Sequence, residues 1–238
     1  MLSLQRLFAM QKQRQLAMPP RAIHPEEKLR KRASILDAAQ DLWTTHTDRL
    51  SSMDALAQAS GVAKGTLYLY FRSKEEVLLA LHERDMEQFF GRVIERAQQA
   101  EPMKAQDLSK LVIESIQNSP TFMPLAALCL GLMERHIPVE LGVAFKLRIT
   151  EQIDKAVLAL RQHFPTISCE TMMQCYALML GLWQLIKQNP VHQHLVTQGI
   201  ETNCKIPVTE EQFLQFLGNS LSTLLIGLLA QAHPEHSL

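Results

Sequence analysis

Apolar residues recur at helical spacing along most of the chain, and no convincing stretch alternates with a period of two. This pattern predicts an all-α protein. Prolines at positions 102, 120, 138, 165 and 190 interrupt the apolar runs and are expected to separate the helices. The predicted helices are Glu26–Thr45, two short helices within residues 51–71, Ser73–Gln99, Asp107–Asn118, Thr121–His136, Val139–Phe164, Ser168–Gln188 and Thr209–Gln231, with residues 189–208 irregular.

Residues 51–76 predict two short helices, a tight turn between them and the start of a longer helix. Ser51 or Ser52 is a suitable N-cap for the first helix, and Gly61 allows the backbone conformation that the turn needs. Ser73 and Glu76 have the spacing of a capping box at the start of the third helix. The inner face of the second helix is expected to consist of Ala63, Leu67 and Phe71.

The outer face of this second helix suits the major groove of DNA. Lysine can neutralise phosphates, tyrosine hydroxyls can donate to phosphate oxygens, and Leu69 can contact a thymine methyl group. The alternative is a solvated helical hairpin whose exposed aromatic residues have no function. The predicted DNA-binding residues are Ser51, Ser52, Lys64, Gly65, Thr66, Tyr68, Leu69, Tyr70 and Lys74.

The run GVAKGTLYLYFRSKEE, residues 61–76, resembles the helix-turn-helix of the TetR family of bacterial transcriptional repressors. The resemblance extends more weakly back to about Lys28, and beyond about Ala97 it concerns the architecture alone. It implies a DNA-binding domain over residues 25–75 and an all-helical effector-binding and dimerisation domain over residues 76–238. Leu69 departs from the polar or aromatic residue that family members often have there, which leaves the operator sequence open.

Charge and cysteine content agree with an intracellular DNA-binding protein. Residues 1–80 have a net charge of +4 and residues 81–238 a net charge of −4, so the head is basic and the body acidic. The four cysteines form no CxxC pair, which favours reduced thiols in the cytoplasm. Residues 1–24 predict a flexible basic extension, or the region before a later start codon. No membrane span is expected.

The last two predicted helices are apolar nearly all round, so both of their sides must be covered. We expect one side to face the core and the other a second copy of the chain, as a two-fold operator requires. Two central core helices of a monomer are the alternative. The predicted interface residues are Met179, Trp183, Leu217, Leu221, Leu224 and Leu228.

Methionine and aromatic side chains in the second half of the chain could line a cavity for a small-molecule effector. The resemblance to TetR proteins, and not residue spacing, implies that a cavity exists; ordinary core packing is the alternative. The predicted pocket residues are Phe90, Phe122, Met123, Cys129, Met133, His136, Phe145, Tyr176 and Trp183.

The sequence contains no pattern typical of an enzyme, a cofactor site or a metal site. A Gly-rich phosphate loop, HExxH and GxSxG are all absent, and the spacing of His192, His194 and Cys204 matches no zinc pattern. We therefore expect a ligand-responsive homodimeric repressor that binds a pseudo-palindromic operator. The alternatives are a TetR-like DNA-binding protein without a small-molecule effector, and an enzyme that retains a relic DNA-binding head.

Overall fold

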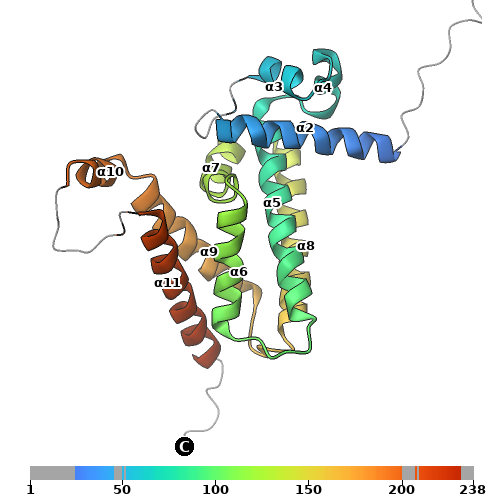
Figure 1. Ribbon diagram of the computed structural model, residues 1–238. Coiled ribbons are helices and arrows are strands. Elements are labelled where there is room, and N and C mark those ends of the chain that lie inside the picture. The colour runs from blue at the N-terminus through green and yellow to red at the C-terminus, as the bar shows by residue number, and fades with distance from the viewer. Residues whose placement is uncertain (1–24, 46–49, 51, 200–206, 208, 232–238) are drawn as a thin grey trace, which may run out of the picture.

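The regular elements in the described part of the chain are all helices (Figure 1), which confirms the predicted fold class. The computed structural model describes residues 25–45, 50, 52–199, 207 and 209–231. The predicted N-terminal extension, Ser51 and Cys204 lie outside these ranges.

Helices α2 (Pro25–Thr45), α3 (Met53–Ala59) and α4 (Lys64–Tyr70) form the head at the top of Figure 1. Ser52 is the N-cap of α3, where its hydroxyl accepts a hydrogen bond of 3.1 Å from the amide of Ala55. Gly61 has a φ of +65°, which turns the chain between α3 and α4 as predicted. The core of the head contains Trp43, Leu56 and Leu67, all almost fully buried.

Helix α5 (Lys74–Ala97) begins at the head and runs the length of the body beside α8 (Val139–Leu160) (Figure 1). Ser73 caps α5 by accepting from the amide of Glu76 at 3.2 Å. The Glu76 carboxylate accepts from the amide of Arg72 at 2.8 Å, one residue earlier than the predicted capping box. With 24 residues, α5 is about 36 Å long and connects the head to the centre of the body.

Charged side chains fix α5 to the helices on either side. Arg84 donates to Asp37 and to Gln40 of α2, each at 2.6 Å. Glu83, the residue before Arg84 on α5, accepts through its carboxylate from two nitrogens of Arg148 on α8. Near its middle, α5 is thus bonded to both the head and the body.

Helices α6 (Ala105–Asn118) and α7 (Phe122–Arg135) lie beside α5. Their junction is held by Asp85 of α5, whose buried carboxylate accepts from the hydroxyls of Ser119 and Thr121, both at 2.7 Å. Burial raises the pKa of Asp85, and these two hydrogen bonds oppose that shift.

Helices α9 (Cys169–Leu182) and α11 (Glu210–Gln231) form the other side of the body, where α11 packs against both α6 and α9. The sequence predicts one helix over residues 168–188, but a π-helical segment, η1 (Trp183–Lys187), follows α9. A short helix, α10 (Pro190–Thr197), also lies in the segment predicted to be irregular. Asn189 accepts from two amides of α10 and Pro190 occupies its first position, and both features are helix-start signals.

Candidate DNA interface and ligand cavity

Helix α4 has one buried and one exposed face. Leu67 is fully buried, whereas Leu69 is 77% exposed and Tyr68 is 42% exposed. Lys64 and Gly65 are exposed at the start of the helix, and no atom lies within 4 Å of a Cβ added at Gly65. An exposed leucine and tyrosine beside a glycine form a surface that can closely approach a base-pair edge.

The other residues predicted to bind DNA are less uniform in position. Lys74 and Ser52 are exposed, and Thr66 is half-buried. Tyr70 is also half-buried, and its hydroxyl is buried without a hydrogen-bond partner among the described residues. Tyr70 therefore packs at the edge of the head core, whereas Tyr68 extends from the exposed face.

Lys64 is paired within the head. Its ammonium lies 2.7 Å from the carboxylate of Asp54 on α3, and both side chains are exposed. The hydrogen bond to Asp54, followed by the attraction between the two charges, raises the pKa of Lys64. On α2, Lys28 and Arg30 are exposed on the same domain, and the Arg32 guanidinium lies 5.4 Å from the centre of the Phe71 ring.

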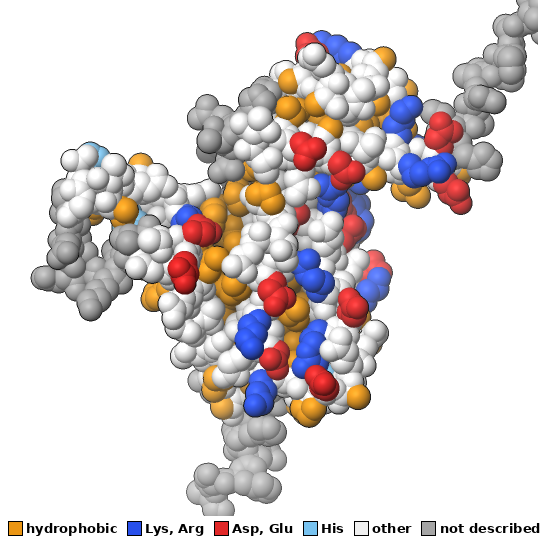
Figure 2. All heavy atoms as spheres, in the orientation of Figure 1, with side chains coloured by type: hydrophobic (Ala, Val, Ile, Leu, Met, Phe, Trp, Pro, Cys, Tyr) orange, Lys and Arg blue, Asp and Glu red, His pale blue; other side chains and the backbone are white. Residues whose placement is uncertain are grey.

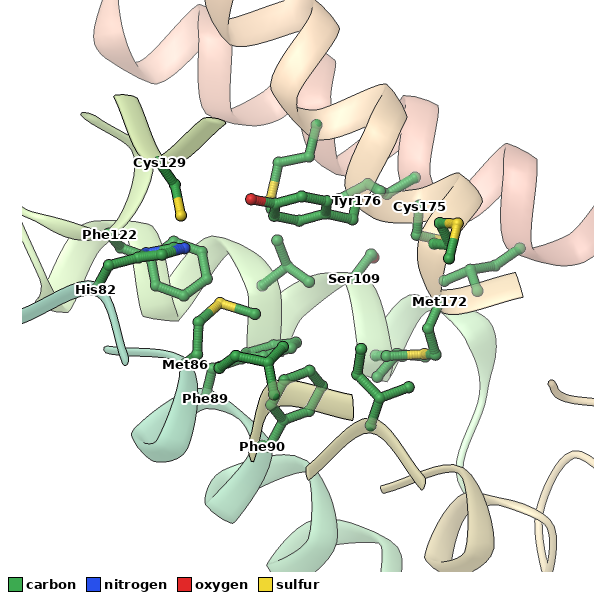
Figure 3. Close-up of a pocket in the computed structure, with 18 of the residues that line it drawn as sticks. His82, Met86, Phe89, Phe90, Ser109, Phe122, Cys129, Met172, Cys175 and Tyr176 are labelled. Atoms are coloured by element: carbon green, nitrogen blue, oxygen red, sulfur yellow. The ribbon is translucent and has the colours of Figure 1, made fainter. Parts of the chain in front are cut away.

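A cavity of about 190 Å³ lies in the body between α5, α6, α7, α8, α9 and α11. Its wall is mainly apolar, as Figure 3 shows for the phenylalanine and methionine side chains around it. Lys146 and Met173 line the cavity and are exposed, so they lie at its rim. Apolar walls with few polar groups are typical of small-molecule sites.

Five of the predicted pocket residues line this cavity: Phe90, Phe122, Cys129, Phe145 and Tyr176. Met123 is buried in the core but is not part of the wall, and His136 is exposed. Trp183 packs against Phe213, with ring centres 5.6 Å apart, and is also not part of the wall. The side chain of Met133 lies outside the described residues.

Sequence reasoning missed several residues of the wall, above all His82 and Met86 on α5. Their spacing from Phe90, at four-residue intervals, is the signal that could have found them. His82 is 3% exposed, and its ring centre lies 6.0 Å from that of Phe145. Ser109, Met172, Cys175, Leu221 and Leu225 also line the cavity.

Burial favours the neutral form of every titratable group inside the cavity. It lowers the pKa of His82 to about 4 and raises the pKa of Cys129 and of Cys175 to about 11. The pKa of Tyr176 rises to about 12, mainly through burial and secondarily through its proximity to Cys129. These four groups of the cavity are therefore uncharged at neutral pH.

The residues predicted for the dimer interface differ in exposure. Leu217 and Leu221 are buried within this chain, and Met179 and Leu221 also line the cavity. Leu224, Leu228 and Trp183 are half-buried. The more exposed apolar residues of this region are Met173 and Leu185, together with Phe216 and Ile226 on α11.

A helix-turn-helix head on an all-helical body with an apolar cavity is the architecture of a DNA-binding transcriptional regulator. The chain belongs to the TetR family. Residues 35–81 match the bacterial regulatory proteins of the tetR family, and residues 83–232 match the tetracyclin repressor-like C-terminal domain.

Individual relatives share part of the sequence or the fold. The fatty acid metabolism regulator protein of Bacillus subtilis is 37% identical over 70 residues, which are 29% of this chain and 36% of that protein. The match thus spans about a third of the relative's length.

Two solved structures align with most of the chain. A TetR family transcriptional regulator from Streptomyces coelicolor aligns with a TM-score of 0.50 at 19% identity, over 84% of this chain and 99% of that chain. LfrR from Mycobacterium smegmatis, solved in complex with proflavine, aligns with a TM-score of 0.48 at 18% identity, over 82% and 96% of the two chains.

Proposed function

We propose that this TetR-family regulator is a homodimeric repressor that binds a pseudo-palindromic operator and releases it when an apolar small molecule occupies the cavity. The observation that supports this most directly is the course of α5. Its first residue, Lys74, is exposed beside the presumed DNA-contacting face, and His82, Met86 and Phe90 of the same helix line the cavity. A ligand that moves this wall therefore acts on an element that begins at the DNA.

A ligand can shift the head only if it binds one conformer more tightly than the other. A coupling of roughly 1–3 kcal/mol, or about 5–150-fold in operator affinity, is typical of such systems. Because Arg84 bonds α5 to α2, a tilt of α5 is expected to move the head as a unit. The two recognition helices of a dimer would then no longer match successive major grooves.

The exposed apolar residues of α9 and α11 support the homodimer. Residues 210–230 have a mean hydropathy of 1.6 and are long and apolar enough, by length and composition, to cross a membrane. Only 28% of this apolar stretch is buried within the chain. The inner face of α11 packs into the core through Phe213, Leu217 and Leu221. A second copy that covers the outer face, with Phe216 and Ile226, accounts for both faces.

The class of effector follows from the cavity wall. An apolar ligand also agrees with the name of the Bacillus subtilis relative, a regulator of fatty acid metabolism, although that match covers 29% of this chain. A TetR-like regulator without an effector is the competing function. It predicts that operator affinity stays the same in the presence of every compound tested.

Selection of bound sequences from a random DNA pool tests the proposal. We expect recovery of an inverted repeat whose half-sites lie about one helical turn apart, or a multiple of it. Operator affinity is then measured with and without a panel of apolar compounds. Failure to enrich any sequence would exclude the DNA-binding function, and failure of every compound to alter the affinity would favour the regulator without an effector.

A further inference from the structure

The polar groups of the cavity differ in how well their hydrogen bonds are satisfied. Ser109 Oγ lies 2.7 Å from Ser222 Oγ and donates to the carbonyl oxygen of Gln106 at 3.0 Å. His82, by contrast, is almost fully buried, and its Nδ1 has no hydrogen-bond partner within the described part of the chain. A buried polar atom is normally paired, so His82 is the group of the wall that most needs a partner.

His82 shares its end of the cavity with two other hydrogen-bonding groups. Figure 3 shows the sulfur of Cys129 and the hydroxyl of Tyr176 turned toward the side where the His82 ring lies. The three residues come from α7, α9 and α5, so three separate helices bring them together. The proximity of Cys129 contributes to the raised pKa of Tyr176.

The rest of the cavity is apolar along the direction of α5. Phe90 follows His82 by two helical turns, a distance of about 12 Å. Ile153 and Met172 line the cavity together with Phe90 and Leu225, and none of the four has a polar group that forms strong hydrogen bonds. The Cys175 thiol lies beside Met172 at this apolar end (Figure 3), but the stronger hydrogen-bonding groups, the imidazole of His82 and the phenol of Tyr176, lie at the other end.

We propose that the cavity binds an uncharged, largely apolar molecule whose single terminal hydroxyl or carbonyl group hydrogen-bonds to His82 and Tyr176. The apolar part of the ligand extends toward Phe90 and Met172. This inference rests on the proposed function, in which the cavity is the effector site, and it adds the chemical class of the ligand.

An anionic head group fits this end poorly. Among the described residues of the wall, Lys146 is the one permanently charged side chain, and it is exposed at the rim. A carboxylate placed among His82, Cys129 and Tyr176 would lose its hydration without a buried cation as partner, which costs several kcal/mol in general. A neutral hydroxyl needs only the donor and the acceptor that imidazole and phenol groups provide.

Calorimetric titration of the full chain without DNA tests the ligand class, with octanol and octanoate as probes that differ in the head group. We expect octanol to bind about tenfold more tightly than octanoate, the effect of roughly one net hydrogen bond or more. Tyr176→Phe removes a single hydroxyl and His82→Phe keeps a flat ring; each should weaken octanol binding several-fold. Lys155→Ala, which removes an exposed lysine of α8 outside the cavity wall, is the matched control and should leave octanol binding unchanged.

Two results would overturn the proposal: octanoate binding as tightly as octanol, or octanol affinity that is the same in the wild type and both ring variants. Thermal melting shows whether His82→Phe is folded, and Tyr176→Phe provides the same test with a smaller change. Operator binding without any probe is measured separately. If the protein binds octanol as described but octanol does not change its operator affinity, the proposed ligand class holds and the effector role of the cavity is excluded.

Discussion

The hydroxyl of Thr121, at the start of α7, donates a 2.7 Å hydrogen bond to the carboxylate of Asp85 in the middle of α5. Ser119 donates to the other carboxylate oxygen at the same distance. All three residues are buried. The α6–α7 junction is therefore attached to the long helix through one carboxylate that depends on two hydroxyl groups.

Thr121→Val should destabilise the fold, because it removes one of these donors and keeps the shape of the side chain. We expect the free energy of unfolding to fall by about 1–3 kcal/mol, the usual effect of leaving a buried acceptor without its partner. Thr121→Ser retains the hydroxyl and serves as the control, expected to lose less. Chemical denaturation measures both. A valine variant as stable as the wild type would show that Asp85 does not need this donor.

Lys74→Ala should weaken binding to all DNA sequences by a similar factor. Lys74 is exposed at the start of α5, where it can neutralise a phosphate without contacting a base. The slope of log affinity against log salt concentration should fall by about one. Lys110→Ala removes an exposed lysine from α6 and should change neither quantity. An unchanged salt slope in Lys74→Ala would exclude the phosphate contact.

Ile226→Glu tests the proposed dimer interface. Ile226 is 50% exposed on the outer side of α11, so a glutamate there remains solvated in a monomer but is buried in a dimer, at a cost of several kcal/mol. Sedimentation should show a monomer, and operator affinity should fall sharply. Leu158→Glu, at an exposed position of α8, is the control and should stay dimeric. If Ile226→Glu also remains a tight dimer, the interface lies elsewhere.

Phe90→Ala should alter the response to an effector more than the basal affinity for the operator. Phe90 is buried on α5, lines the cavity and packs against Phe89 with ring centres 5.1 Å apart. Its truncation can cost about 3–5 kcal/mol of stability, so melting must first show a folded variant. The measured quantity is operator affinity without effector divided by affinity with effector. The same ratio in wild type and variant would mean that Phe90 does not transmit the signal.

Acid should destabilise the protein partly through His82. Its pKa is about 4 in the fold against an ordinary value of 6.5, so the unfolded chain binds the proton more readily. The stability contributed by neutral His82 is fully present above pH 6.5 and is lost as the pH falls toward 4, up to about 3 kcal/mol. Burial raises the pKa of the neighbouring Asp85 and of Glu87, which acts in the opposite direction.

The comparison of wild type with His82→Phe isolates this effect, because the two carboxyl groups are present in both proteins. Chemical denaturation at about pH 7 and about pH 5 should show a smaller loss of stability in the variant, which has no imidazole to protonate. Equal losses in the two proteins would show that His82 is not buried in its neutral form.

Local sequence signals were sufficient for the helices of the head. Gly61, the serine caps and the apolar spacing act within a few residues of one another, so a single sequence shows them. The cavity wall was only partly predictable, since it depends on how distant helices meet. Tyr176 and Phe90 could be proposed as cavity residues because their side chains are aromatic. The proximity of His82 to Cys129 and Tyr176, however, depends on packing between α5, α7 and α9.

The sequence did not indicate where the regular α-helix ends near residue 183. A regular α-helix over residues 168–188 has a period of 3.6 residues, whereas η1 has the wider turn of a π-helix. The wider turn rotates the side chains that follow Trp183 relative to the expected faces. Trp183 itself has α-helical backbone angles, and its ring packs against Phe213 outside the cavity wall. No periodicity in the sequence indicated the π-helical turn.

The exposed surface of the body was also only partly predictable from the sequence. In Figure 2, hydrophobic side chains form a band between the α9–α11 side and the α6–α7 part of the body, and charged side chains gather over α5 and α6. The sequence indicated that α11 has too many apolar residues for one covered face. Which of them point outward depends on the packing of α11 against α6, and this packing places Leu217 and Leu221 inward and Phe216 and Ile226 outward.

The ion pair between Lys64 and Asp54, 2.7 Å apart, makes DNA contact at the start of α4 a competition between two anions. A phosphate that binds the Lys64 ammonium must replace the Asp54 carboxylate as its partner, and this carboxylate remains nearby. The exchange itself costs little, because exposed pairs contribute little to stability. The released Asp54 stays on the same surface and repels the phosphate. Lys64 therefore adds less to DNA affinity than a lysine without a neighbouring carboxylate would.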